Sequence, residues 1–262
     1  MNGREMYKKK NKRIPFLNTY IDNLTMEEAV AVVMALSEGN DNHYVVTPNA
    51  DHIVRLEKDE EFQKVYQNAD LILADGKPLI WLSRLLGTPI KEKVSGSDLF
   101  PAVCERAAGE GKSMFFLGAA PGVAAEAARR LQERYPGLEV AGTYSPSYGF
   151  EKDRKEIAHI VETLNQKRID ILCLGLGTPK QEKFFCHMRN VLHVGVALNI
   201  GAAIDFEAGN MKRAPVWMQG CGLEWLYRLM QEPRRLFKRY LIDDMKIIGI
   251  AWKYRKRHED SD

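Results

Sequence analysis

Short, continuous apolar runs recur along the middle of the chain and are separated by amphipathic stretches. Runs of this length and character are typical of strands that are buried on both faces of a parallel sheet. A further apolar segment at residues 14–17 is predicted to form a short edge strand. The expected buried strands cover residues 43–46, 71–74, 113–117, 138–143, 169–174 and 194–198.

Helical spacing of apolar residues fills most of the segments between these runs. Thr25 and Glu28 have the spacing of a capping box, and they open a helix that ends near residue 37. Alternation of strands and helices predicts an α/β fold, which is Rossmann-like, with a mostly parallel sheet and helices on both faces. The other expected helices cover residues 50–55, 60–67, 79–86, 99–108, 123–134, 152–167 and 181–190.

The composition of the chain changes near residue 210. Residues 211–262 contain twelve Lys and Arg against seven Asp and Glu, a local charge of about +5, whereas the whole chain carries +3. We therefore predict three parts: a disordered basic N-terminus at 1–13, an α/β core at 14–210, and a C-terminal appendage of basic amphipathic helices at 211–262. A mildly acidic core with a basic appendage indicates that the appendage meets an anionic partner.

Aromatic and apolar residues interleave with Arg and Lys from Trp225 to Trp252. This pattern is typical of helices that lie in the surface of an anionic membrane. A helix pair packed on the core is the alternative, since amphipathicity suits both. In solution the same apolar face would fray or be buried in a homo-oligomer. No run of about 18 apolar residues exists, so we expect no membrane-spanning helix.

Several function classes are poorly supported. The six histidines lack metal-ligand spacing, and the only D-x-D sequence lies at residues 260–262. Neither a dinucleotide fingerprint nor a P-loop is present, so we expect no cofactor and no metal. No nucleic-acid motif is present either. The four cysteines lack paired spacing, which favours reduced, mostly buried thiols, and Cys186 beside His187 is a weak candidate for a nucleophile and its base.

Asp75 is the most informative single residue. It follows the apolar run at 71–74 and precedes Gly76 and Pro78, a turn residue and a helix-starting residue. Asp75 therefore lies at the carboxyl end of a strand, where open α/β sheets bind their ligands. A carboxylate there can act as a general base, and the alternative is that Asp75 merely caps the next helix.

Three other strand ends carry small or polar residues: 47–49, 118–120 and 175–180. Glycine-rich turns into helices attract phosphate groups, so a nucleotide or sugar nucleotide would fit this edge of the sheet, although structural turns explain the glycines equally well. Basic side chains could meet the charge of a leaving diphosphate in place of a metal ion. Those available are Lys93, Lys180, Lys212, Arg213, Arg228, Arg234, Arg235 and Arg239.

Eight short motifs occur in an order that resembles the WecG/TagA/CpsF family of bacterial glycosyltransferases, glycosyltransferase family 26. The resemblance covers residues 14 to about 242, and the ordered set is highly specific although each motif alone is weak. The motifs are T-P-N at 47–49, A-D-G at 74–76, V-S-G-S-D at 94–98, L-G-A-A at 117–120, G-T-P-K-Q-E-K at 177–183, N-I-G-A-A at 199–203, G-N-M-K-R-A-P at 209–215 and G-L-E-W-L-Y-R at 222–228 with E-P at 232–233.

The resemblance implies an inverting, metal-independent transfer of a sugar from a UDP-sugar donor. In well-known members the sugar is N-acetylmannosamine or its uronic acid, and the acceptor is N-acetylglucosamine linked by pyrophosphate to undecaprenol. It further implies a peripheral enzyme on the cytoplasmic face of the bacterial membrane, in cell-surface polysaccharide or teichoic acid synthesis. The alternatives are another UDP-hexose or uronic acid donor in capsule or exopolysaccharide synthesis, and a non-catalytic module that binds sugar nucleotides or anionic lipid.

The resemblance also assigns residues. Asp75 matches the proposed base, Thr47 and Asn49 share its pocket, and Gln181 is the Gln of P-K-Q-E. The phosphate-meeting arginines match Arg228 and Arg235, which would share one face of a continuous helix. The family often has Arg where this chain has Lys93, which keeps the charge but loses a bidentate grip on phosphate. The remaining candidate substrate-binding residues are Gly118, Ala119, Gly177 and Lys180.

Overall fold

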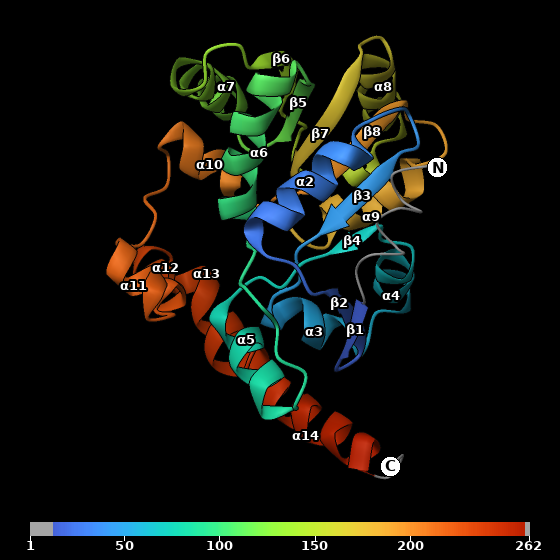
Figure 1. Ribbon diagram of the computed structural model, residues 1–262. Helices are drawn as coiled ribbons and strands as arrows, with labels where there is room; N and C mark the ends of the chain where they lie inside the picture. The colour runs from blue at the N-terminus through green and yellow to red at the C-terminus, as the bar shows by residue number, and fades with distance from the viewer. Residues whose placement is uncertain (1–12, 260–262) are drawn as a thin grey trace.

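The computed structural model describes residues 13–259 and has a six-stranded sheet at its centre (Figure 1). The strand order is β4-β3-β8-β7-β5-β6, and every neighbouring pair is parallel. The predicted α/β fold is therefore confirmed. The strands are β3 (His43–Val46), β4 (Leu71–Ile72), β5 (Ser113–Gly118), β6 (Glu139–Tyr144), β7 (Ile169–Gly175) and β8 (Val194–Asn199).

Helices cover both faces of the sheet, because alternate strand residues feed two separate apolar clusters. One cluster joins the sheet to α2 (Met26–Leu36), α6 (Gly96–Glu110), α7 (Val123–Arg134) and α10 (Ala203–Ala208). The other joins it to α3 (Ala50–Leu56), α4 (Glu60–Gln67), α5 (Lys77–Leu85), α8 (Arg154–Asn165) and α9 (Lys180–Met188). A short 3₁₀ turn, η1 (Phe150–Lys152), precedes α8.

The predicted helix starts agree with the structure to within three residues. The Thr25 capping box is present, with the Thr25 amide donating to Glu28 at 2.8 Å. Helix α6 begins three residues before the predicted start at Leu99, because the Ser95 side chain caps it by accepting from the Asp98 amide at 3.2 Å. This earlier start brings Asp98 into the first turn of α6, where its charge suits the helix dipole.

The edge of the sheet beside β4 is covered by a hairpin. The predicted edge strand is β1 (Arg13–Phe16), but it pairs antiparallel with a second strand that was not predicted, β2 (Thr19–Asp22), in a sheet of its own. The Asp22 carboxylate accepts from the Ile72 amide at 2.8 Å, and Arg13 donates to the carbonyls of Ala69 and Asp70. These bonds satisfy edge groups that would otherwise face solvent.

The C-terminal part forms a string of short helices that crosses below the sheet (Figure 1). Pro233 begins a new helix, so the tail is not continuous, and the condition under which Arg228 and Arg235 would share one face is not met. The segments are α11 (Val216–Gly220), α12 (Glu224–Gln231), α13 (Pro233–Lys238), the π-helical turn η2 (Arg239–Asp243) and α14 (Lys246–Glu259). Below, "the tail" means these five segments and the turns between them, residues 216–259.

Some side chains of the tail pack on the core, whereas others are exposed. Ile247 and Ile250 of α14 are buried in the same apolar cluster as α3 and α5, and Lys253 forms an ion pair with Glu57 at 2.6 Å. In residues 13–259 no helix has the length and apolar character needed to cross a bilayer. The predicted basic N-terminus lies outside the described residues except for Arg13, and the D-x-D sequence at 260–262 lies wholly outside them.

Candidate active site

A cavity of about 510 Å³ opens at the carboxyl edge of the sheet, beside β3 and β4. Its core side is formed by the loops after these strands, by α5 and by the start of α6. Its other side is formed by the tail. Residues far apart in sequence therefore meet in one space, and among them are Asn49, Asp75, Ser95, Arg228 and Arg239.

Asp75 is placed in this cavity as predicted. Its amide donates to the Pro48 carbonyl at 2.8 Å, which fixes the loop after β4 against the loop after β3. The capping alternative is wrong, because Gly76 is the N-cap of α5, with φ of 102°, and no side chain caps this helix. Burial raises the pKa of Asp75 to about 6, although Lys93 and His52 nearby act to lower it. Asp75 is thus a carboxylate at neutral pH and a moderately strong base.

Lys93 lies behind Asp75 in a cluster of alternating charges. Its Nζ is 2.8 Å from Asp98 and 3.2 Å from Glu224 of the tail. Arg213 contacts the same Asp98 at 2.6 Å. Burial acts to raise the pKa of Asp98, but its bonds with Lys93, Ser95 and Arg213 outweigh this and lower it to about 2. The cluster ties the start of α6 to the tail and holds a fixed ammonium near Asp75.

Asn49 and Thr47 occupy different places. Asn49 lines the cavity, caps α3 by accepting from the His52 amide, and has its Oδ1 2.8 Å from His52 Nδ1. Thr47 lies one step deeper, where its hydroxyl donates to the Asn199 carbonyl at 3.5 Å. The two residues are close in the loop after β3, but only Asn49 faces the cavity.

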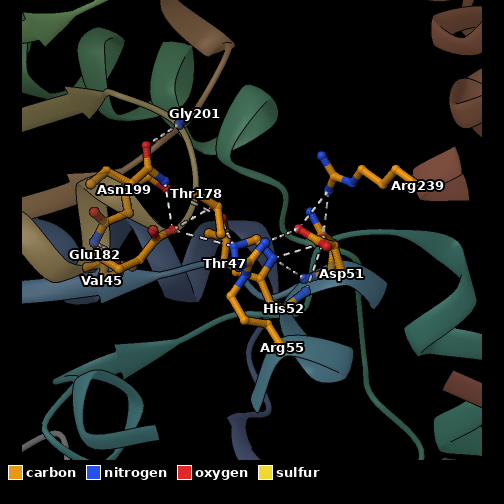
Figure 2. A network of polar contacts seen from close by, with 12 residues as sticks. Val45, Thr47, Asp51, His52, Arg55, Thr178, Glu182, Asn199, Gly201 and Arg239 are labelled. Atoms are coloured by element: carbon orange, nitrogen blue, oxygen red, sulfur yellow. Dashed lines mark hydrogen bonds and ion pairs between the residues drawn. The ribbon is translucent and has the colours of Figure 1, made fainter. Parts of the chain in front are cut away.

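A polar network connects Asn49 through His52 to Thr178 in the loop after β7, and Figure 2 shows His52, Thr178 and Glu182 of this network. His52 Nε2 lies 2.8 Å from the Thr178 hydroxyl, which donates to Glu182 at 2.9 Å. The Gln181 side chain also donates to Glu182, and its amide oxygen Oε1 accepts from the Gly201 amide at 3.2 Å. Gln181 is buried, so its place here is that of a support for the strand ends.

Two tail arginines enter the cavity. Arg228 stacks over the ring of Phe206 at 5.6 Å, and Arg239 reaches Asn49 at 3.5 Å and Asp51 at 3.6 Å (Figure 2). The Nε groups of both arginines are buried and find no hydrogen-bond partner within residues 13–259. Unused guanidinium donors beside a cavity are suited to bind an anion.

Arg235, the predicted partner of Arg228, is placed elsewhere. It is exposed, forms an ion pair with Glu232 at 2.6 Å, and does not line the cavity. Arg239 stands in its place, because the break at Pro233 and the π-helical turn change which side chains face the core. In the sequence Arg239 was one of eight available basic residues, and no local signal separated it from the rest.

The glycine-rich turns lie at the ends of β5 and β7, and none of their predicted residues lines the cavity. A Cβ on Gly118 would lie 2.4 Å from the Gly175 carbonyl, and Ala119 adopts φ of 58° while donating to that same carbonyl at 3.0 Å. Gly177 also has positive φ, and Lys180 pairs with Glu151 at 3.0 Å. These glycines are explained by close strand packing and turn geometry.

Among the cavity residues that sequence reasoning missed are Trp81 of α5 and Tyr240 and Asp244 of the tail. Burial raises the pKa of Asp244 to about 6, partly opposed by Arg239, and its Oδ1 has no hydrogen-bond partner in the described residues. A second carboxyl group thus shares the cavity with Asp75. Its position follows from how the tail folds back on the core, which no local pattern encodes.

The cysteines and a possible metal site were the remaining candidates from the sequence. Burial raises the pKa of the Cys186 thiol, and His187 pairs with Glu61 at 2.9 Å, so this pair is not a nucleophile with its base. Of the other cysteines, Cys104 and Cys173 are buried, whereas Cys221 is exposed. Across the described residues no group of three or more His, Cys, Asp or Glu side chains is placed to hold a metal ion.

Comparison with known proteins identifies the family of the chain. Residues 14–261 match the model of the glycosyl transferase WecG/TagA/CpsF family. Two relatives carry the name N-acetylglucosaminyldiphosphoundecaprenol N-acetyl-beta-D-mannosaminyltransferase. The one from Bacillus spizizenii is 35% identical over 196 residues, 75% of this chain and 74% of the relative. The one from Bacillus subtilis is 29% identical over 235 residues, 87% of this chain and 85% of the relative. The chain therefore belongs to the WecG/TagA/CpsF family of glycosyltransferases.

Proposed function

We propose that the protein transfers N-acetylmannosamine from a UDP-sugar to N-acetylglucosamine carried on undecaprenyl diphosphate. The observation that supports this most is the placement of Asp75, a carboxylate with raised pKa, in one cavity with two arginines that have unused donors. The names of the two relatives supply the donor sugar and the acceptor. The product would enter a cell-surface polymer such as a teichoic acid or another polysaccharide.

In the proposed reaction the carboxylate of Asp75 takes the proton from the attacking acceptor hydroxyl. The hydroxyl oxygen then forms a bond to the anomeric carbon of the donor on the face opposite the diphosphate. The bond from that carbon to the diphosphate oxygen breaks, and UDP leaves with the electron pair. Attack from the opposite face inverts the configuration, and the one proton lost by the acceptor resides on Asp75 until solvent removes it.

The charge of the departing diphosphate is assigned to basic side chains. Arg228 and Arg239 are the proposed contacts, because each lines the cavity and has an Nε without a partner in the described chain. Lys93 adds a positive charge close to Asp75 but is held by Asp98 and Glu224, so it acts through its field. A metal-independent transfer is proposed on this basis.

The tail is proposed to dock on the anionic cytoplasmic face of the membrane, where a polyprenyl-linked acceptor resides. Several large apolar side chains of the tail are exposed, Met230, Phe237 and Ile242 among them, and basic residues lie between them. Apolar side chains that enter the interface and basic ones that meet lipid headgroups act together in such docking. Docking would bring the cavity to the acceptor's diphosphate.

Turnover decides between this proposal and a non-catalytic binding module. The protein is incubated with a panel of UDP-hexoses, UDP-N-acetylhexosamines and UDP-uronic acids, together with a GlcNAc-diphosphate-lipid acceptor, and the glycolipid product is analysed by mass spectrometry. We expect transfer that is fastest with UDP-N-acetylmannosamine. Faster transfer from another donor would replace the sugar assignment alone, whereas binding without transfer from any donor would favour the binding module.

A further inference from the structure

The cavity that contains Asp75 has an apolar half for which the transfer chemistry has no use. One wall of this half is α5, which contributes Trp81, Leu82 and Leu85. The facing wall is the tail, which contributes Leu241, Met245 and Ile248. Five of these six side chains are exposed by 43% to 66%, although residues of their kind are normally buried. Below, "the apolar slot" means the space between these two walls.

The two walls meet at the polar end of the cavity. Gly222, in the turn between α11 and α12, has φ of 74°, and a Cβ there would lie 3.0 Å from the ring of Trp81 and 3.0 Å from Lys77. The tail backbone thus rests directly on α5, which runs beside the tail in Figure 1. The Trp81 ring therefore marks the boundary between the charged groups and the apolar slot.

The distribution of charge indicates what kind of molecule fits. Besides the six apolar side chains of the slot walls, the cavity is lined by three basic residues, by three carboxyl groups and by two serines: Lys77, Arg228 and Arg239; Asp75, Glu224 and Asp244; Ser95 and Ser97. Glu224 is already paired with Lys93 and Arg213, whereas the Nε groups of Arg228 and Arg239 have no partner in the described residues and remain for an anion. The complement of such a cavity is an amphiphile that carries an anionic head and a hydrocarbon chain, because each half of it would leave water for matching surroundings. A sugar nucleotide has no hydrocarbon part and would leave the slot empty.

We propose that the apolar slot binds the first isoprene units of the acceptor lipid, so that the enzyme recognises the chain as well as the sugar-diphosphate head. This inference rests on the proposed function, from which the identity of the acceptor comes. It assigns a substrate contact to α5, outside the tail and outside the residues that meet the diphosphate. Recognition of the chain inside the protein is distinct from docking on a membrane, because it operates on a single acceptor molecule in solution.

The test uses two water-soluble acceptors with the same GlcNAc-diphosphate head, one a methyl ester and the other a farnesyl ester. Without membranes, kcat/KM is measured for the full-length wild type, for W81Q and L85Q in the slot, and for W217Q as the matched control. Trp217 is 64% exposed on α11 and does not line the cavity. Thermal unfolding of each variant checks that it is folded.

We expect the wild type and W217Q to favour the farnesyl acceptor by about tenfold or more, since each buried apolar carbon adds to binding. In L85Q this preference should fall to about twofold, with the methyl ester rate and the KM of the UDP-sugar unchanged. In W81Q, whose ring borders the charged groups, the same loss of preference is expected whatever the rate with the methyl ester. Equal rates for the two acceptors in the wild type, or equal losses on both in the slot variants, would overturn the inference while leaving the proposed function intact. An increased KM for the UDP-sugar in W81Q and L85Q would instead assign the slot to the donor. Absence of transfer to either acceptor by the wild type would mean that the proposed function itself is wrong.

Discussion

The Nη2 of Arg239 lies 3.5 Å from the Oδ1 of Asn49, a residue 190 positions earlier in the chain. Asn49 caps α3 at the end of β3, whereas Arg239 begins the π-helical turn of the tail. This contact closes the cavity from the tail side. It means that the proposed anion-binding donors and the strand-end acid come from segments far apart in the sequence.

Replacement of Arg239 tests whether this contact serves the reaction. We expect R239A to lower kcat/KM by roughly 10- to 100-fold, the effect of losing one or two charge-assisted hydrogen bonds to the diphosphate. R235A is the matched control, because Arg235 lies in the same tail but is exposed and paired with Glu232. It should remain within about threefold of the wild type. A larger loss in R235A than in R239A would restore the assignment made from the sequence.

Protonation of Asp75 should set the lower end of the pH range in which the enzyme is active. Because the pKa of Asp75 is about 6, the base form is lost as the pH falls, and kcat/KM should decrease below pH 6. D75N should lower kcat by roughly 10²- to 10⁴-fold at neutral pH. D244N is the control, since Asp244 has a similarly raised pKa in the same cavity. If D244N rather than D75N abolishes turnover, Asp244 is the base.

The same raised pKa makes a prediction for stability. A carboxyl group whose pKa is higher in the folded state than the ordinary 3.8 favours folding when protonated, and this contribution is lost as the pH rises through about 6. D75N should therefore be more stable than the wild type at pH 8, by roughly 1–2 kcal/mol. The difference should vanish below about pH 4. Urea unfolding at both pH values measures it, and an unstable D75N at pH 8 would contradict the burial argument.

Much of the fold could be predicted because its signals are local. Continuous apolar runs located all six strands of the sheet, and the Thr25–Glu28 pair located the start of α2. Strand β2 was missed, because its four residues acquire strand geometry by pairing with β1 and by the hydrogen bond that the Ile72 amide donates to the Asp22 carboxylate. Pairing of this kind depends on contacts between segments and leaves little trace in the pattern of either one.

The site residues likewise divide into those that a local signal locates and those that depend on the fold of the tail. Asp75 could be placed from its own neighbours, since a strand end followed by Gly76 and Pro78 fixes where the side chain lies. Arg239 could not be distinguished from Arg235, because the choice depends on the helix break at Pro233 and on the turn that follows it. The contact between Lys93 and Glu224, 131 residues apart, likewise follows only from the folded tail.

Removal of divalent metal should leave the reaction intact. We expect the rate in EDTA to stay within about twofold of the rate with Mg²⁺, because guanidinium and ammonium groups are assigned to the diphosphate. The comparison is made after dialysis against EDTA, with and without added Mg²⁺ or Mn²⁺. A rate that EDTA abolishes and metal restores would show that these basic side chains do not suffice.

Membrane docking by the tail can be tested without truncation, which would strip Ile247 and Ile250 from the core cluster. Phe237 is 56% exposed on α13 and does not line the cavity, so F237E adds a charge to the proposed docking face without touching the site. Val191 is 49% exposed, lies before β8 at the opposite edge of the sheet, and gives the matched control V191E.

Liposomes with anionic lipid should bind F237E about tenfold more weakly than the wild type, since an apolar anchor is lost and a like charge is added, while V191E binds normally. Soluble short-chain acceptors should be used equally well by both variants. If F237E binds liposomes as the wild type does, this face of the tail does not meet the membrane, and the basic residues at 8–13 become the candidate anchor.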